Sequence, residues 1–465
     1  MKKLFNIKRF KRGEVVYLVI LLIFFLFLII FRFHNALAFN PYWGYDGGGH
    51  IDYLFSIAYE NKIPEVSQNY IAWHEPLYYF VFGGLLKLAL LFKSNLDFGL
   101  ALKVLSSLQV ILSLLTTLVI FKLTKLLTKN RVIIVLATIL INLLPSFNQA
   151  STFLTNELLN YFFIFLILYY FFKNFVFKKK PLYKNYFILG LLLGLALLTK
   201  ITALILLIII SLYLLWRLII SRKRIKTSQG LALIILLVFI INLPLQIYRQ
   251  QNDLDLISVN NTNFLEPQSL KLDERVKFFA FLDKDIFLYP YWYSGGRSFW
   301  SMLYADTFYD YYGSIENQNY INYLLGNDPS QLEKTTHANT YVTKNNFIIS
   351  KILVWLALLL LVIFIWGLVG NIKKFINQRK SVYFLYSFIP LSFLASLIYF
   401  AYRYPYYDHG IVKAIFIFPA FIFLIIPGLE AIYKLSKKTI YVLVPLVLIY
   451  SLLIIQLYWV VKFNY

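Results

Sequence analysis

The 465-residue chain contains no cysteine and few charged residues. The lack of cysteine excludes disulfides, thiolate metal sites and a cysteine nucleophile. Charged residues make up only 14% of the sequence, whereas hydrophobic residues make up 60% and the mean hydropathy is +0.67. This composition excludes an ordinary soluble protein.

Long apolar runs occupy most of the chain. The run at residues 15–33 is long enough to cross a hydrocarbon core as a helix, and similar runs recur. We therefore predict an all-α polytopic membrane protein with about eleven transmembrane helices. The predicted spans are residues 15–33, 98–121, 132–147, 154–172, 185–199, 201–220, 230–248, 348–370, 381–400, 411–428 and 439–461.

The distribution of charge predicts how these helices are oriented. Lysine and arginine total 45 and acids 22, and more than half of the basic residues fall in six short segments at alternate ends of the spans. Among the acids, only Glu14 and Glu430 lie near those segments. Basic loops favour the cytoplasm, so we expect an inner or plasma membrane protein with its N-terminus inside. The net charge of +23 then indicates contact with anionic membrane lipids and not with nucleic acid.

Two apolar segments need separate interpretation. Counting residues 77–92 as a span would turn two basic loops outward, so we predict a helix on or in the outer membrane surface. Ala36-Leu37-Ala38 fits a signal-peptidase site, but the preceding apolar run is longer than a usual signal peptide. We therefore expect an uncleaved signal anchor.

The first external loop concentrates polar chemistry between two apolar segments. Residues 40–79 contain two of the five histidines and several acids. These side chains are Asp46, His50, Asp52, Glu60, Glu65, His74 and Glu75. We expect any catalytic activity to begin in this loop.

Four motifs follow one another in the first half of the chain. They are Asp46 in the first external loop, His74–Tyr79 (HEPLYY), Thr155-Asn156-Glu157 and Gly190–Lys200 (GLLLGLALLTK). Their order resembles the GT-C superfamily of membrane glycosyltransferases, in the branch of the protein O-mannosyltransferases and the aminoarabinose (lipid A) transferases. In that branch the four positions correspond to the catalytic acid, an HPPLYY element, a second external acid and a GLxxGLAxLTK stretch. Two departures are Gly47, where the family often has Glu, and Glu75, which replaces a proline.

The resemblance implies both an architecture and a reaction. Residues 1–248 would form a GT-C-like catalytic transmembrane module that includes loop 34–97, with juxtamembrane helices in that loop. Residues 249–347 would form a large external loop before the eighth span, and residues 348–465 the C-terminal transmembrane helices. The implied activity is mannosyltransferase-like. It transfers a hexose or pentose from a polyprenyl-phosphate donor to a hydroxyl of a glycolipid, protein or cell-envelope polymer, with inversion.

Asp46 and Glu157 are the predicted catalytic residues. Because a lipid phosphate is a good leaving group, the reaction needs a base for the acceptor hydroxyl more than an acid, and Asp46 suits that role. An aspartate in a glycine-rich turn can also serve the backbone alone. Glu157 lies at the outer end of a span, where a carboxylate needs a cavity or a partner, although a solvated acid at a helix start fits the same pattern.

Cationic and histidine side chains on the external face are the predicted binding residues for the donor phosphate or other substrate groups. They are His50, His74, Lys200, Arg297, Arg403, His409 and Lys413. Arginine offers the best geometry for phosphate, but each of these cations could instead anchor lipid head groups. We assign no metal ligand, although Asp46 and His50 together with Glu157 or His74 leave a divalent cation possible as a cofactor.

Two other functions fit a polytopic membrane protein. A polysaccharide polymerase or ligase would rely on arginine and histidine in the long loop, which has few of either. A lipid or solute transporter would show inverted repeats and charges near the bilayer midplane, and the sequence indicates neither.

Overall fold

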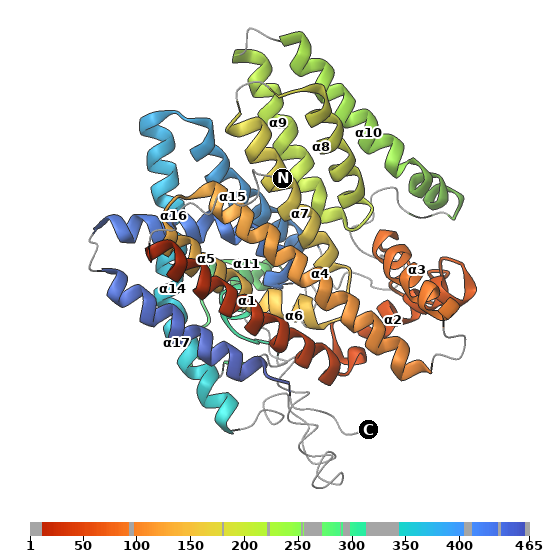
Figure 1. The fold of residues 1–465 in the computed structure, drawn as a ribbon, viewed down its shortest axis with the longest axis horizontal. Coiled ribbons are helices and arrows are strands. Elements are labelled where there is room, and N and C mark those ends of the chain that lie inside the picture. The colour runs from red at the N-terminus through yellow and green to blue at the C-terminus, as the bar shows by residue number, and fades with distance from the viewer. Residues whose placement is uncertain are drawn as a thin grey trace.

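The computed structural model describes residues 12–92, 97–178, 181–220, 224–252, 254, 272–288, 290–291, 298–312, 344–403, 412–435 and 439–460. Within these ranges the chain forms helices and turns and no β-strand (Figure 1). The α-helices are α1 (Arg12–Ala38), α2 (Gly47–Phe55), α3 (Leu77–Phe92), α4 (Phe98–Leu127), α5 (Arg131–Leu143), α6 (Pro145–Thr152), α7 (Glu157–Phe171), α8 (Tyr183–Leu197), α9 (Leu204–Ile220), α10 (Arg224–Gln251), α11 (Leu272–Ala280), α12 (Phe299–Phe308), α14 (Lys344–Gln378), α15 (Ser381–Arg403), α16 (Ile422–Leu435) and α17 (Ile440–Tyr458).

Among the described residues, nine helical segments are long and apolar enough to cross a membrane. These are Val15–Ala38, Phe98–Leu127, Glu157–Val176, Ile201–Ile219, Arg224–Gln251, Asn345–Gln378, Ser381–Arg403, Phe418–Leu435 and Tyr441–Tyr458. The pair α5 and α6 would make a tenth span if both helices belong to one crossing. The predicted all-α polytopic membrane fold is confirmed.

The structure differs from the predicted spans in three places. The span predicted at 411–428 lies at Phe418–Leu435. The segment predicted as one span at 132–147 bends by 55° between α5 and α6. Leu144 precedes Pro145 and leaves the helical region (ψ 141°), as residues before proline tend to do. The span predicted at 185–199 corresponds to α8, a 15-residue apolar helix that is shorter than the segments counted above.

The apolar stretch that was excluded from the spans forms the 16-residue helix α3. Figure 1 shows α3 beside α2, at the edge of the helix bundle. A Cβ on Gly83 would lie 2.9 Å from Ile57 and from the Leu54 carbonyl, so this glycine lets α3 approach α2 closely. Leu91 and Phe92, at the far end of α3, are exposed.

Glycines also bring membrane helices into close contact. A Cβ on Gly190 would lie 3.1 Å from Ile234 Cα, and one on Gly194 would lie 2.6 Å from Ile241. The glycines of the GLLLGLALLTK motif thus let α8 pack on α10, as small residues do in membrane helices. This packing positions the last turn of α10, which contains Arg249.

Loops lie at the two ends of the bundle. At the end with the basic loops, Arg217 in the last turn of α9 donates to the Phe175 carbonyl, and Thr128 after α4 donates to Glu430 of α16. At the other end, the loop before α3 contacts the start of α7 and the end of α10. The chemistry predicted from the sequence lies at this second end.

Candidate active site

Asp46 is the last residue before α2 and adopts a left-handed backbone conformation, with φ 54° and ψ 25°. Aspartate tolerates this region better than most residues other than glycine. Its carbonyl accepts the His50 amide at 3.1 Å, but its carboxylate makes no capping hydrogen bond to α2. The Asp46 side chain is therefore exposed and available at the start of the helix.

The glycines after Asp46 let α2 sit against the rest of the loop. A Cβ on Gly49 would lie 2.6 Å from Ile71 and 3.2 Å from Asn69 Oδ1. Asn69 donates to the Gly49 carbonyl at 2.8 Å and accepts the Ile71 amide at 2.8 Å. The segment before His74 is thus held directly on α2.

His50 lies one turn into α2 and is buried. Its Nδ1 is 2.7 Å from the Tyr79 hydroxyl, and Tyr79 in turn stacks on Tyr53 with ring centroids 3.7 Å apart. Burial lowers the pKa of His50 to about 4; the nearby Asp46 opposes this shift and Lys200 adds to it. His50 is therefore neutral at neutral pH.

His74 stands edge-on to His50, with ring centroids 5.7 Å apart. Its Nδ1 lies 3.0 Å from Asn156 Nδ2, and the same Nδ2 lies 3.3 Å from the Thr199 carbonyl. Burial lowers the pKa of His74 well below its usual value, and the nearby Lys200, His50 and Arg249 add to this shift. Asn156 therefore connects the HEPLYY motif to the end of the GLLLGLALLTK motif.

Glu75, next to His74, forms a buried ion pair with Arg249 at the end of α10, at 3.5 Å. Arg249 also donates to the Trp73 carbonyl at 3.0 Å. Burial raises the pKa of Glu75, and Arg249 opposes that shift. Arg249 was not predicted from the sequence, although its place at the external end of a predicted span was a usable signal.

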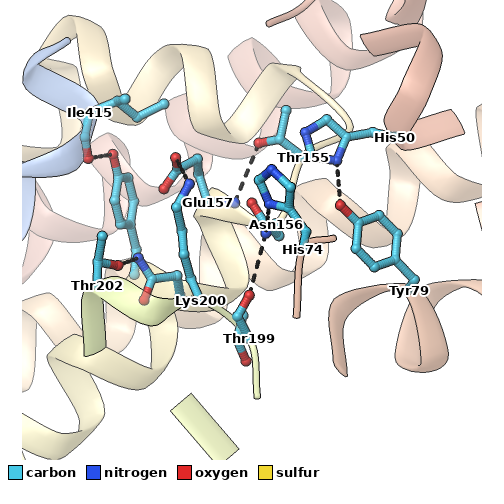
Figure 2. Close-up of polar contacts among 12 residues, drawn as sticks. His50, His74, Tyr79, Thr155, Asn156, Glu157, Thr199, Lys200, Thr202 and Ile415 are labelled. Carbon is cyan, nitrogen blue, oxygen red and sulfur yellow. Dashed lines mark hydrogen bonds and ion pairs between the residues drawn. The ribbon is translucent and has the colours of Figure 1, made fainter. Parts of the chain in front are cut away.

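Glu157 and Lys200 form a second buried ion pair, between the first turn of α7 and the turn that joins α8 to α9. Figure 2 shows the two side chains pointing at each other, with His74, Asn156 and Thr199 beside them. Lys200 Nζ also lies 5.2 Å from the centre of the Phe416 ring. Oε2 of Glu157 is buried without a hydrogen-bond partner.

Residues 87–248 match the family model described as dolichyl-phosphate-mannose-protein mannosyltransferase. The match indicates a membrane glycosyltransferase. It confirms the resemblance to the GT-C superfamily and covers about a third of the chain. The matched segment includes Glu157 and Lys200, whereas Asp46, His50 and His74 precede it. No curated protein matches the chain.

Four predicted binding residues of this glycosyltransferase-like chain remain to be placed, and the structure describes two of them. Lys413 Nζ lies 4.0 Å from the centre of the ring of Tyr45, the residue that precedes Asp46 in the sequence. Arg403 is exposed at the end of α15. Arg297 and His409 lie outside the described residues.

One acid near this site was not predicted from the sequence. Asp306 of α12 is fully buried, and its Oδ2 accepts the Ala414 amide at 2.6 Å. Burial raises the pKa of Asp306 to about 7, against the opposing effects of the Ala414 amide and Lys413. Nothing in the composition of the aromatic loop around Asp306 distinguishes it from a solvated acid.

The histidine and acidic side chains that could bind a metal ion do not converge in the part of the chain that the structure describes. No group of three histidine or acidic side chains there is placed to hold a metal ion. His50 and His74 face each other, but Glu157 is turned to Lys200. The described site is thus arranged around ion pairs and hydrogen bonds.

Proposed function

We propose that the protein transfers a sugar from a polyprenyl-phosphate donor to an acceptor hydroxyl on the external face of the cytoplasmic membrane. One observation carries the proposal. An exposed carboxylate (Asp46), two neutral histidines and a buried lysine–glutamate pair from separate segments lie together at the end of the bundle opposite the basic loops. The match to the mannosyltransferase family supports a lipid-linked donor.

Asp46 takes the proton of the acceptor hydroxyl in this scheme. The hydroxyl oxygen forms a bond to the anomeric carbon, and the bond from that carbon to the phosphate oxygen breaks. The lipid phosphate leaves with the electron pair, so no general acid is required. Attack opposite the leaving group inverts the anomeric centre.

Lys200 supplies positive charge beside the histidines, and Glu157 positions it. An ammonium group has three donors, so Lys200 can hold Glu157 and still donate to a phosphate oxygen. Lys413, stacked over the ring of Tyr45, is a second cation proposed to bind the donor phosphate. Arg403 remains a proposed phosphate ligand from the end of α15.

An assay of purified protein with a panel of radiolabelled polyprenyl-phosphate sugars tests this function. Asp52 offers a matched control for Asp46, because it is also an exposed aspartate of the α2 region. We expect Asp46→Asn to abolish transfer and Asp52→Asn to retain it. Full activity of Asp46→Asn would remove Asp46 from the mechanism, and equal loss in both variants would point to a general effect of charge.

A transporter would call for a buried charge inside the membrane, and Arg32 is a buried cation inside α1. Its guanidinium donates to Thr117 at 2.8 Å and to Asn142 at 3.0 Å, and it lies 4.5 Å from the centre of the Phe147 ring. These neutral partners join α1, α4 and α5 in a buried polar cluster. This arrangement fits a structural contact between helices better than a transport path.

A further inference from the structure

The orientation of the Asn156 amide fixes the protonation of His74. Nδ2 of Asn156 lies 3.3 Å from the Thr199 carbonyl oxygen, which can only accept a hydrogen bond. The group at this position is therefore the NH₂ group, and it donates to His74 Nδ1 at 3.0 Å. Because Nδ1 accepts, the proton of the neutral His74 ring resides on Nε2.

The Nε2–H group of His74 is open to a ligand. It has no hydrogen-bond partner among the described residues, and it is not one of the buried unpartnered atoms. Asn156, in contrast, is completely enclosed, with 1% of its surface exposed. The structure thus holds one nitrogen of the ring rigidly and leaves the other as an unused donor.

The charges around His74 favour its neutral form. The nearby cations Lys200 and Arg249 disfavour a second proton on the ring. Arg249 is paired with Glu75 and Lys200 with Glu157. A ligand oxygen that reaches His74 therefore meets a neutral N–H donor beside a cationic side chain.

We propose that His74 binds a phosphate oxygen of the lipid-linked donor as a neutral Nε2–H donor, and that Asn156 is the positioning residue that sets this tautomer. The inference rests on the proposed function. It assigns to His74 neither a base role nor a metal-ligand role, because Nδ1 is occupied and Nε2 carries the proton. His50 differs, because its Nδ1 partner is a tyrosine hydroxyl that can donate or accept.

Binding of undecaprenyl phosphate to the full-length protein in detergent tests the role of His74. A glutamine amide reaches the position of Nε2, whereas an asparagine amide reaches that of Nδ1. We expect His74→Gln to bind within about threefold of the wild type. We expect His74→Asn to bind about ten- to a hundredfold more weakly, which is the range for a hydrogen bond to a charged group.

The outcomes separate this inference from the proposed function. If the wild type does not bind undecaprenyl phosphate, the proposed function and this inference are both wrong. If the wild type binds and the two His74 variants bind equally well or equally poorly while folded, only this inference is wrong. A loss that appears only with a sugar-bearing donor would place the contact on the sugar and overturn the phosphate assignment.

Asn156→Asp tests the positioning role with a readout that a purely structural role would not change. A carboxylate accepts from Nδ1–H, so the neutral ring loses its Nε2 proton and only the imidazolium keeps it. The ratio of variant to wild-type affinity, which cancels the titration of the ligand, should then fall as pH rises from 5.5 to 8. Asn160→Asp is the matched control, because Asn160 is also a buried asparagine, in the first turn of α7, but contacts Thr202 and no histidine. A constant ratio for Asn156→Asp, or the same slope in Asn160→Asp, would overturn the inference.

Discussion

Glu157 and Lys200 form an ion pair across 43 positions of sequence, with side chains only 8% and 11% exposed. Two charges removed from water are costly, and their attraction offsets that cost only with good geometry. Here the pair joins α7 to the turn between α8 and α9, and Lys200 also contacts Phe416 near α16. The pair therefore organises three segments at the proposed reaction site.

Breaking this pair on one side should destabilise the protein more than removing it entirely. Glu157→Gln leaves a buried ammonium and Lys200→Met a buried carboxylate, each costing about 3–5 kcal/mol of unfolding free energy. In the double variant neither charge remains, so its loss should be well below the sum of the two. Unfolding in detergent, followed for the four proteins of the cycle, measures this coupling. Additive losses would show that the two side chains do not interact.

Arg249 should be needed to hold the HEPLYY segment in place. Arg249→Met removes the donor to the Trp73 carbonyl and leaves Glu75 buried without its cation. Because a buried carboxyl without a cation favours protonation, the variant should lose less stability at pH 5 than at pH 8. The Michaelis constant for the donor should also rise, since His74 lies between Trp73 and Glu75. Combining Arg249→Met with Glu75→Gln is the control and should remove the pH dependence.

Gly49 should tolerate a methyl group far less well than its neighbour Gly48. A Cβ on Gly49 meets Ile71 at 2.6 Å and Tyr70 at 3.1 Å, whereas a Cβ on Gly48 has only Tyr42 at 3.7 Å. We expect Gly49→Ala to cost about 1–3 kcal/mol, the range for overpacking, and Gly48→Ala to cost little. Melting temperatures and transfer rates of the two variants check this. Equal effects would mean that loop 65–74 does not pack on α2 in the membrane.

The buried, neutral His50 should make stability fall in mild acid. Its pKa is about 4 in the folded protein and about 6.5 when unfolded, so between these values the unfolded chain binds more protons. The stabilisation is complete above pH 6.5 and is lost as pH falls toward 4, by about 2 kcal/mol at pH 5. His50→Gln should flatten this part of the profile of melting temperature against pH. An unchanged slope would show that His50 is not the group that titrates.

The features of this protein that the sequence predicts are those that depend on neighbouring residues in the chain. Apolar runs located the spans, and the basic loops indicated that 77–92 is a helix that does not cross, as the short helix α3 allows. The motifs marked His74, Glu157 and Lys200, which the structure brings together. The break at Pro145 was not predicted, although proline cannot continue a helix without losing a hydrogen bond.

The partners of these residues were not predictable from the sequence, because they depend on how distant helices pack. Arg249 reaches Glu75 only because glycines of α8 let α10 approach. Asn156 contacts His74 across 82 positions, and nothing local distinguishes it from Asn160 one turn later. The sequence predicts which side chains belong to the site. The tertiary contacts decide which of them form ion pairs and hydrogen bonds with one another.

The absence of cysteine makes the predicted orientation directly testable, because each introduced cysteine is the only thiol in the protein. Gln68, between α2 and α3, and Lys184, at the start of α8, are both exposed and belong to opposite ends of the bundle. If the site faces outward, a membrane-impermeant maleimide should label Gln68→Cys in intact cells and Lys184→Cys only after permeabilisation. The reverse pattern would place the site in the cytoplasm, where a nucleotide-linked donor becomes available. Labelling of both positions in intact cells would contradict the alternation of loops on which the proposed external reaction depends.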